Sequence, residues 1–515
     1  MANWPVQPPI NTLSTSRAQV ASRALMLMVS FAFCIILLSA FAGSHIVYAL
    51  LVIPLVVVMA WTNPVAMIGL LPIWMVLMGF LRRITPGGGN STFSGDPVIM
   101  VGPVAILCLF AVSATSDREI EKFSPLAKIV ILLNVVTLFQ ALNPAQHSLM
   151  TGMGGLLFIL IPALAFWVGR RYSSEQILER LMWMIAFSSL GVAIYGLIQQ
   201  FVGFPSWDSA WVETDGYTAL NVGNGVVRAF GTSSSAQEYA LFLAVGVITW
   251  VALGVRGSRV PLVVRWPATA TVAVALYYES QRTSVFLCVL ALGVMFAAWR
   301  RWRPLLVGLA GVGSIVLLVV FAGFLGGSPS GNGVDGVTTA QQLSNHQLSG
   351  LTDPNGSNSS LSGHIKLQRR GIISGFTHPL GYGTGSVTIS ATRYNRTANL
   401  HGTEYDPGNM GVAFGILGIG LYLLLLRNVF RTSYRLALAR NDSLGLFVMG
   451  ISAVTIFQWM NGDLYSVCWL FWFALGCGDQ MAQEPSTRDA EDEPIAVAAW
   501  EWRRPGEARR TISLS

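Results

Sequence analysis

Charged residues are scarce in this chain. Asp, Glu, Lys and Arg together make up 11% of its 515 residues, whereas 53% are hydrophobic. Soluble domains carry about 25% charged residues. A protein of this length with so few charges cannot build a water-soluble surface, so a soluble fold is excluded and a lipid bilayer is the solvent that fits the composition.

Lysine and cysteine are rare as well. Lysine occurs only at Lys122, Lys128 and Lys366, so arginine carries nearly all of the positive charge behind the net charge of +7. The arginines lie in short segments between apolar runs, which is typical of membrane topology rather than of a nucleic-acid-binding surface. The five cysteines all fall inside apolar runs, which favours buried thiols over a disulfide framework or a metal site. We therefore expect membrane lipids, and no nucleic acid, among the partners.

Several motifs of soluble enzymes are missing. The chain has no Walker loop, no dinucleotide-binding fingerprint and no CxxC pair. It also lacks the paired aspartates with which soluble nucleotide-sugar transferases hold a divalent metal. We expect no metal and no cofactor, and a transferase of this kind would take its donor from a lipid carrier.

Long apolar runs occupy most of the chain instead. Their approximate bounds are 24–42, 46–61, 64–81, 98–114, 127–142, 150–168, 181–203, 236–254, 267–279, 283–299, 304–325, 409–427, 445–461 and 464–478. A helix needs about 17 to 25 residues to cross a bilayer, and several runs are shorter. The sequence therefore predicts an all-α, polytopic membrane bundle of about 12 to 14 transmembrane helices.

Arginine-rich segments predict the orientation. They lie at 170–180, 256–265, 300–303 and 427–440, and they alternate with poorly charged connections. Because positive charge is retained in the cytoplasm, we expect this order: a cytoplasmic N-terminus (1–23), a first transmembrane block (24–325), a large periplasmic loop (326–408), a second transmembrane block (409–478) and a cytoplasmic polar tail (479–515). Within the loop, residues 364–386 predict a short amphipathic helix followed by a glycine-rich turn.

Arg82 and Arg83 break this rule, because the same register places them outside. Either the first spans are miscounted or the pair has a function at that place, and we favour a miscount.

Arg228 is the first residue with a candidate chemical role. It lies in RAFGTSSS, on an outward connection just before an apolar run that opens with residues typical of a helix cap. A guanidinium beside a helix N-terminus suits a phosphate or pyrophosphate. The alternative is an interfacial arginine that reaches lipid headgroups.

Arg282 is the second candidate. Glu279, Gln281 and Arg282 lie in a tight turn between two apolar runs, where charge is costly and therefore indicates function. The alternative is an ion pair between Glu279 and Arg282 that only pins the hairpin.

His401 is the third candidate, because it precedes Glu404 and Asp406 just before a span. A histidine oriented by a carboxylate is a common arrangement for taking a proton from a hydroxyl. A solvated loop histidine is one alternative, and a metal site made of these three residues is another. No second His/Cys cluster supports the metal.

Four stretches together resemble the O-antigen ligase and polymerase superfamily of bacterial envelope enzymes. They are RAFGTSSS, SQRTS, SGHIKLQRRGIISGFTHPLGYGTGS and LHGTEYDPGNMGVAFGILGIGLYLLL, and their order relative to the spans carries the resemblance over residues 180–480. Each motif is weak alone. The chain departs from the family pattern at Gly402, where the family has Asn, and at Gln281, where it has Ser. His364 stands where many members have Arg or Lys.

The resemblance implies an enzyme of the bacterial inner membrane with its active site on the periplasmic side. Its reaction would be metal-independent, inverting transfer of a glycan from undecaprenyl pyrophosphate to a hydroxyl of a glycan or lipid acceptor, in O-antigen, lipopolysaccharide or exopolysaccharide synthesis. Arg228 and Arg282 would hold the pyrophosphate, His401 would orient or deprotonate the acceptor, and His364 and Arg369 would help to bind substrate. The departures keep Glu404 as an alternative base.

A transporter or flippase for a lipid-linked or anionic solute is the competing function. Charges inside spans and helices broken at the membrane midplane would favour it. Here the charges gather at the outer rim, which favours a reaction at the outer leaflet.

Overall fold

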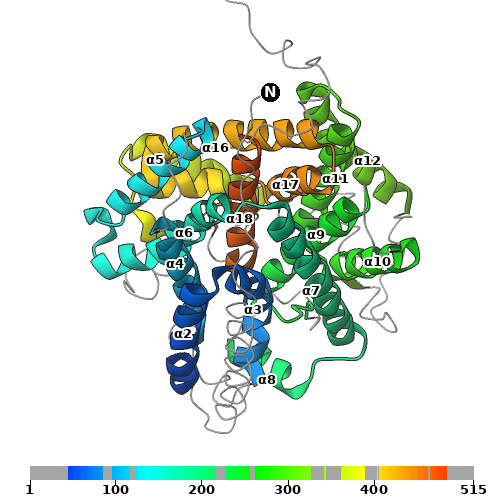
Figure 1. Cartoon of the computed structure of the whole chain (residues 1–515), viewed down its shortest axis with the longest axis horizontal. Coiled ribbons are helices and arrows are strands. Elements are labelled where there is room, and N and C mark those ends of the chain that lie inside the picture. The colour runs from blue at the N-terminus through cyan, green and yellow to red at the C-terminus, as the bar shows by residue number, and fades with distance from the viewer. Residues whose placement is uncertain are drawn as a thin grey trace, which may run out of the picture.

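The computed structural model describes residues 45–84, 96–115, 123–215, 227–255, 261–325, 342–343, 361–388, 403, 405–461 and 464–483. Of these residues, 84% are helical. The expected all-α architecture is therefore confirmed for the described part of the chain (Figure 1).

The helices follow the apolar runs of the sequence. In the first half of the chain they are α2 (His45–Thr62), α3 (Pro64–Ile84), the 3-10 turn η1 (Pro97–Met100), α4 (Val101–Ala114), α5 (Pro125–Gln140), the 3-10 turn η2 (Pro144–Gln146), α6 (Leu149–Arg171), α7 (Glu175–Phe201) and α8 (Ser206–Asp215). In the second half they are α9 (Ala236–Leu253), α10 (Leu262–Glu279), α11 (Arg282–Trp299), α12 (Pro304–Leu325), α14 (Leu361–Thr377), the 3-10 turn η4 (Thr384–Val387), α16 (Asp406–Arg440), α17 (Ser443–Val454) and α18 (Tyr465–Met481).

Two helices extend beyond their predicted apolar runs, and one run lies outside the described residues. The predicted run 409–427 is part of α16, which continues through the arginine-rich segment to Arg440, because Arg, Leu and Ala are all strong helix formers. Helix α18 extends to Met481, three residues beyond the predicted run 464–478. Helix α8 falls in a segment where no run was predicted. The run at 24–42 lies outside the described residues.

Seven of the described helices are long and apolar enough to cross a membrane. They are Pro64–Ile84, Pro97–Ala114, Leu149–Arg171, Glu175–Phe201, Ala236–Leu253, Arg282–Trp299 and Asp406–Arg440. Large apolar side chains also face outwards, with Phe139 71%, Val263 82% and Leu305 75% exposed. Such a surface fits a multi-pass membrane protein, in which lipid covers the outside of the bundle. The full count of 12 to 14 spans stays a prediction.

Polar contacts join several helix termini at one end of the bundle, which we call end A. Arg82, in the last turn of α3, donates to Asp96 before α4 and to Ser234 before α9. Glu238, in the first turn of α9, accepts from the backbone amide of Ser466 in the first turn of α18. The end of α3 therefore lies beside the starts of α4, α9 and α18.

The opposite terminus of α18 lies at a second gathering of helix ends, end B. Asp479, near the end of α18, accepts from Ser124 before α5 and from Arg170 near the end of α6. Arg440, at the end of α16, pairs with Glu175 at the start of α7, with 2.7 Å between Nη2 and Oε1. Two of the arginine-rich segments therefore share end B, as the predicted register requires.

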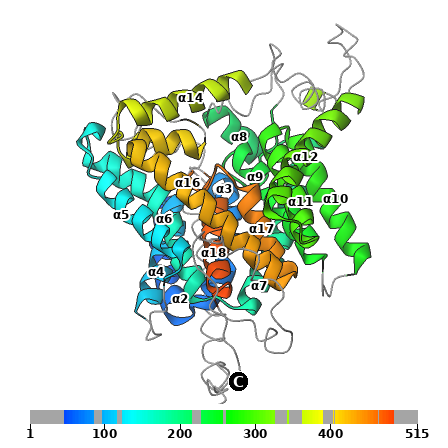
Figure 2. The same cartoon turned by 90° about the horizontal axis from the view of Figure 1, so that it is seen from above.

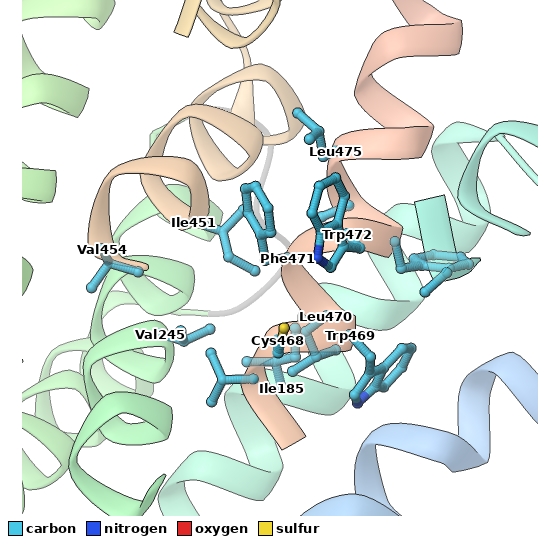
Figure 3. Packing of buried hydrophobic residues seen from close by; sticks show 14 of the residues in the cluster. Ile185, Val245, Ile451, Val454, Cys468, Trp469, Leu470, Phe471, Trp472 and Leu475 are labelled. Carbon is cyan, nitrogen blue, oxygen red and sulfur yellow. The ribbon is translucent and has the colours of Figure 1, made fainter. Parts of the chain in front are cut away.

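Helix α18 lies at the centre of the bundle (Figures 1 and 2). Every residue from Ser466 to Gln480 is buried, including Trp469, Phe471 and Trp472. Figure 3 shows these rings packed among aliphatic side chains of neighbouring helices. The indole Nε1 of Trp472 donates to the carbonyl of Trp459 at 2.9 Å, so even the polar atom of this buried ring is satisfied.

The predicted amphipathic helix and glycine-rich turn are present as α14 and residues 378–383. Helix α14 lies against the first turns of α16 at end A (Figure 2). Helix α16 is broken at Gly415, whose φ of 66° and ψ of −149° are not helical. The turn fills the break: the amides of Tyr382 and Gly383 donate to the carbonyls of Val412 and Ala413 at 2.8 and 3.0 Å. Backbone groups that the break frees are thus satisfied by the turn.

Candidate functional site

Arg228 lies on the segment that leads into α9 at end A. Ser235 caps this helix by accepting from the backbone amide of Glu238, so the predicted cap is confirmed. Glu238 places a buried carboxylate in the same first turn, which disfavours an anion at the helix end itself. The guanidinium of Arg228 is half-buried, and its Nε has no hydrogen-bond partner among the described residues. An anion here would therefore be held by the side chain rather than by the helix.

Arg282 lies at the start of α11, directly after the turn that ends α10. This turn is sharp because Ser280 adopts a left-handed conformation with φ of 71°. Glu279 is 1% exposed, and its Oε2 accepts from the amide of Gln281 at 2.8 Å. Its Oε1 and the hydroxyl of Ser280 find no hydrogen-bond partner among the described residues. The alternative in which Glu279 and Arg282 form a pinning ion pair is therefore not what the turn adopts.

The two candidate arginines come together in space. Arg228 is near enough to act electrostatically on both Glu279 and Arg282. Among the described residues, this cluster holds two guanidinium groups and one carboxylate, an excess of positive charge. Together with the unpartnered polar atoms of Arg228, Glu279 and Ser280, that excess suits an anionic ligand that carries hydroxyl groups.

His364 reaches the same place from α14. Its ring lies 6.3 Å from the ring of Tyr405, just before α16, in an edge-on arrangement. The Tyr405 hydroxyl is 3.1 Å from the hydroxyl of Thr283, the residue after Arg282. These contacts link the starts of α14, α16 and α11. Arg369, on the same helix as His364, is exposed to the surroundings.

His401 and Glu404 lie outside the described residues, so their part in the site stays a prediction. Asp406, the third member of that group, is buried and serves the fold. Both of its carboxylate oxygens lie 3.1 Å from the amide of Met460, and its own amide donates to the carbonyl of Phe457. It thus ties the start of α16 to the connection between α17 and α18.

Sequence reasoning missed a set of buried polar residues beside this cluster. Arg83 donates to Asp208 in α8 and to the carbonyls of Gly231 and Ser233, in the segment that follows Arg228. The only signal was the break in the positive-inside rule, for which we favoured a miscount. Helices α2 and α3 match two of the first three predicted runs, and the run at 24–42 lies outside the described residues. The buried contacts give the arginine pair a structural role at end A.

The adjacent residue Arg82 also forms a buried ion pair, with Asp96. Asp96 lies 2.9 Å from Nδ1 of His45 and also accepts from Arg82. Burial alone would raise the pKa of Asp96, but the contact with His45 and the charge of Arg82 hold that pKa at about 2. This carboxylate therefore stays ionised at any pH that a cell meets.

No family model and no curated protein matches this chain. The superfamily resemblance is therefore an expectation from four short motifs. Of these motifs, three contribute residues to the cluster at end A: RAFGTSSS gives Arg228, SQRTS gives Arg282, and the α14 stretch gives His364. The fourth supplies Tyr405, which joins the last two.

Proposed function

We propose that the chain is a membrane glycosyltransferase that moves a glycan from undecaprenyl pyrophosphate to an acceptor hydroxyl. The observation that supports it best is the meeting of Arg228, Arg282 and Glu279 at one end of a bundle with an apolar outer surface. An amphiphilic donor with a diphosphate fits both features. Its polyprenyl chain stays in the membrane, while its charged group reaches the guanidinium pair.

In this reaction the acceptor oxygen attacks the anomeric carbon while the bond from that carbon to the diphosphate oxygen breaks. The acceptor proton passes to His401, or to Glu404 in the alternative, and the diphosphate leaves on its carrier. Negative charge grows on the diphosphate in the transition state, where fixed guanidinium groups stabilise it. Attack from the opposite face inverts the anomeric carbon, and neither a metal ion nor a cofactor is required.

The proposal includes a location and a cellular role. End A faces the periplasm of a bacterial inner membrane, and the transferred glycan belongs to O-antigen, lipopolysaccharide or exopolysaccharide synthesis. Ligase and polymerase activities are separated by a deletion strain examined on gels. Full-length chains that remain on their lipid carrier indicate a ligase, whereas single repeat units indicate a polymerase.

The test replaces Arg228 or Arg282 with Lys in purified protein in nanodiscs. Lysine keeps a charge but loses the planar donor set that grips two phosphate oxygens. We expect transfer to fall about 30- to 1000-fold, the effect of one charge-assisted contact in a partly desolvated site. Arg300→Lys, an exposed arginine after α11, is the matched control and keeps its activity. Wild-type transfer in both Arg228→Lys and Arg282→Lys excludes the proposed clamp.

His401→Ala separates the two halves of the reaction. It is expected to bind donor normally and to lose transfer, because the acceptor proton has no base. If this variant transfers normally, Glu404 is the next residue to replace.

Transport of a lipid-linked or anionic solute is the second candidate, and the break in α16 at Gly415 favours it, since transporters use interrupted helices. In this chain, however, the turn at 378–383 occupies the break, so the carbonyls of Val412 and Ala413 already have backbone partners. Proteoliposomes distinguish the two functions: a flippase moves a labelled lipid-linked sugar across the bilayer without any acceptor, and a transferase does not.

A further inference from the structure

Arg83 uses its buried guanidinium on three acceptors at once. Its Nε donates to Oδ1 of Asp208 at 2.6 Å, Nη1 to the carbonyl of Ser233 at 2.6 Å, and Nη2 to the carbonyl of Gly231 at 2.7 Å. The side chain is fully buried. Its guanidinium carbon also lies 4.7 Å from the ring centre of Phe230, two residues after Arg228. One side chain from α3 therefore holds most of the segment between Arg228 and α9.

Gln199 and Tyr195, both from α7, add hydrogen bonds to the same segment and to Asp208. Gln199, from α7, accepts from the amides of Phe230 and Gly231 through Oε1, at 3.2 and 2.8 Å. Its amide nitrogen donates to Oδ2 of Asp208 at 2.7 Å, and the hydroxyl of Tyr195 donates to the same oxygen at 2.6 Å. Every polar side-chain atom of Arg83, Asp208 and Gln199 has a hydrogen-bond partner, which fixes the position of the backbone after Arg228.

We propose that Arg83 is a positioning residue that sets where the Arg228 guanidinium meets a diphosphate group. This inference rests on the proposed function. Gly231 is three positions after Arg228, so a shift of the held segment moves Arg228 directly; three positions span at most about 10 Å. Because the α9 end itself is occupied by Ser235 and Glu238, the position of Arg228 depends on this hold rather than on the helix.

Lysine cannot replace Arg83 in this role. Its single ammonium can pair with Asp208, but it lacks the rigid fork that reaches two carbonyls at the same time. Arg83→Lys therefore keeps a charge in the buried site while releasing Gly231 and Ser233. The milder variant Tyr195→Phe removes one hydrogen bond to Asp208 and leaves Arg83 in place.

Another buried ion pair of the protein provides the matched control. Arg82, the preceding residue, pairs with Asp96 but also contacts the segment through the Ser234 hydroxyl at 3.4 Å, so it cannot serve as the control. Arg170 pairs with Asp479 at end B, away from Arg228. Arg170→Lys thus weakens a buried ion pair of the same kind without releasing any part of the segment that follows Arg228.

The experiment uses the full chain in nanodiscs, with inorganic pyrophosphate as the probe. Arg83→Lys is expected to weaken pyrophosphate binding about 10- to 100-fold, the cost of misplacing a binding group by about 1 Å. Both Arg83→Lys and Arg170→Lys are expected to lower the melting temperature, and by similar amounts. Arg170→Lys is expected to bind pyrophosphate like the wild type. Tyr195→Phe is expected to show a smaller loss of binding. Hydrogen–deuterium exchange is expected to accelerate in residues 228–235 for Arg83→Lys and not for Arg170→Lys.

Two results overturn the inference. One is wild-type pyrophosphate affinity in a folded Arg83→Lys protein, and the other is an equal loss of affinity in Arg83→Lys and Arg170→Lys, which indicates general loosening. Failure of the wild type to bind pyrophosphate counts against the proposed function instead. In that case exchange at 228–235 still decides whether Arg83 holds the segment: unchanged exchange refutes it, and selective acceleration supports it.

Discussion

Replacing Gly415 with Ala tests the junction between the glycine-rich turn and the broken helix α16. An added Cβ at Gly415 would lie 1.9 Å from the carbonyl oxygen of Pro379 and 2.3 Å from its carbon. Both are backbone atoms, so no side chain can rotate away to make room. The turn that hydrogen-bonds Val412 and Ala413 would have to move away from α16.

The size of the effect follows from two contributions. Gly415 has φ of 66° and ψ of −149°, a region nearly restricted to glycine, where another residue costs about 1 to 3 kcal/mol. Forcing a methyl group into a filled site costs about 1 to 3 kcal/mol more. The sum, about 2 to 6 kcal/mol, is large for one methyl group, and the displaced turn also shifts α14 with His364.

The assay compares melting temperature and transfer for Gly415→Ala and Gly420→Ala in detergent. Gly420 lies in the same helix, and a Cβ there would meet nothing within 4 Å. Gly420→Ala is therefore expected to be neutral or stabilising by up to about 1 kcal/mol. Equal melting temperatures and equal transfer rates in the two variants would refute the packing described for this junction.

Three further predictions concern topology, pH and metal. A cysteine introduced at Arg369 in a cysteine-free variant is expected to react with an impermeant reagent from outside the cell, and one at Arg300 is not; the reverse pattern contradicts the orientation. Asp96→Asn is expected to destabilise the protein by about 2 kcal/mol, from a pKa of about 2 against an ordinary 3.8. A lowered carboxylate pKa contributes stability above its ordinary value and loses it only as the pH falls toward 2, so thermal melts at pH 5 and pH 8 should show the same difference from wild type, and a smaller difference at pH 5 would contradict the low pKa. Transfer is expected to survive EDTA, and activity lost to chelation and restored by one divalent ion would overturn the arginine-based mechanism.

The sequence could predict the helices because the residues that indicate each helix lie within it or next to it. Ser235 before an apolar run indicated the start of α9. An amphipathic mixture of apolar and basic residues before a glycine-rich turn indicated α14. The end of α16 was not visible, because the arginines that mark topology are also good helix formers. Charge indicated which end of a span a segment occupies, but it did not indicate where the helix stops.

The contacts that position the segment after Arg228 could not be predicted, because the residues that form them are distant along the chain. Arg83 is 125 positions from Asp208 and 148 positions from Gly231. One sequence gives no local pattern that joins them, and the arginine pair could be noticed only as a violation of a rule. The break at Gly415 was hidden for a similar reason, since the amides that compensate for it come from residues 382 and 383.

The burial of α18 has a consequence for how the protein is made. This helix follows every other described helix in the chain, yet its side chains fill the space between them. During synthesis, the membrane helices that precede α18 are made before their central partner exists, and Arg170 has no Asp479 to pair with. Insertion and final assembly are therefore separate stages of biogenesis. Until residues 465–481 emerge, lipid or an insertion factor must cover the surfaces that α18 later occupies.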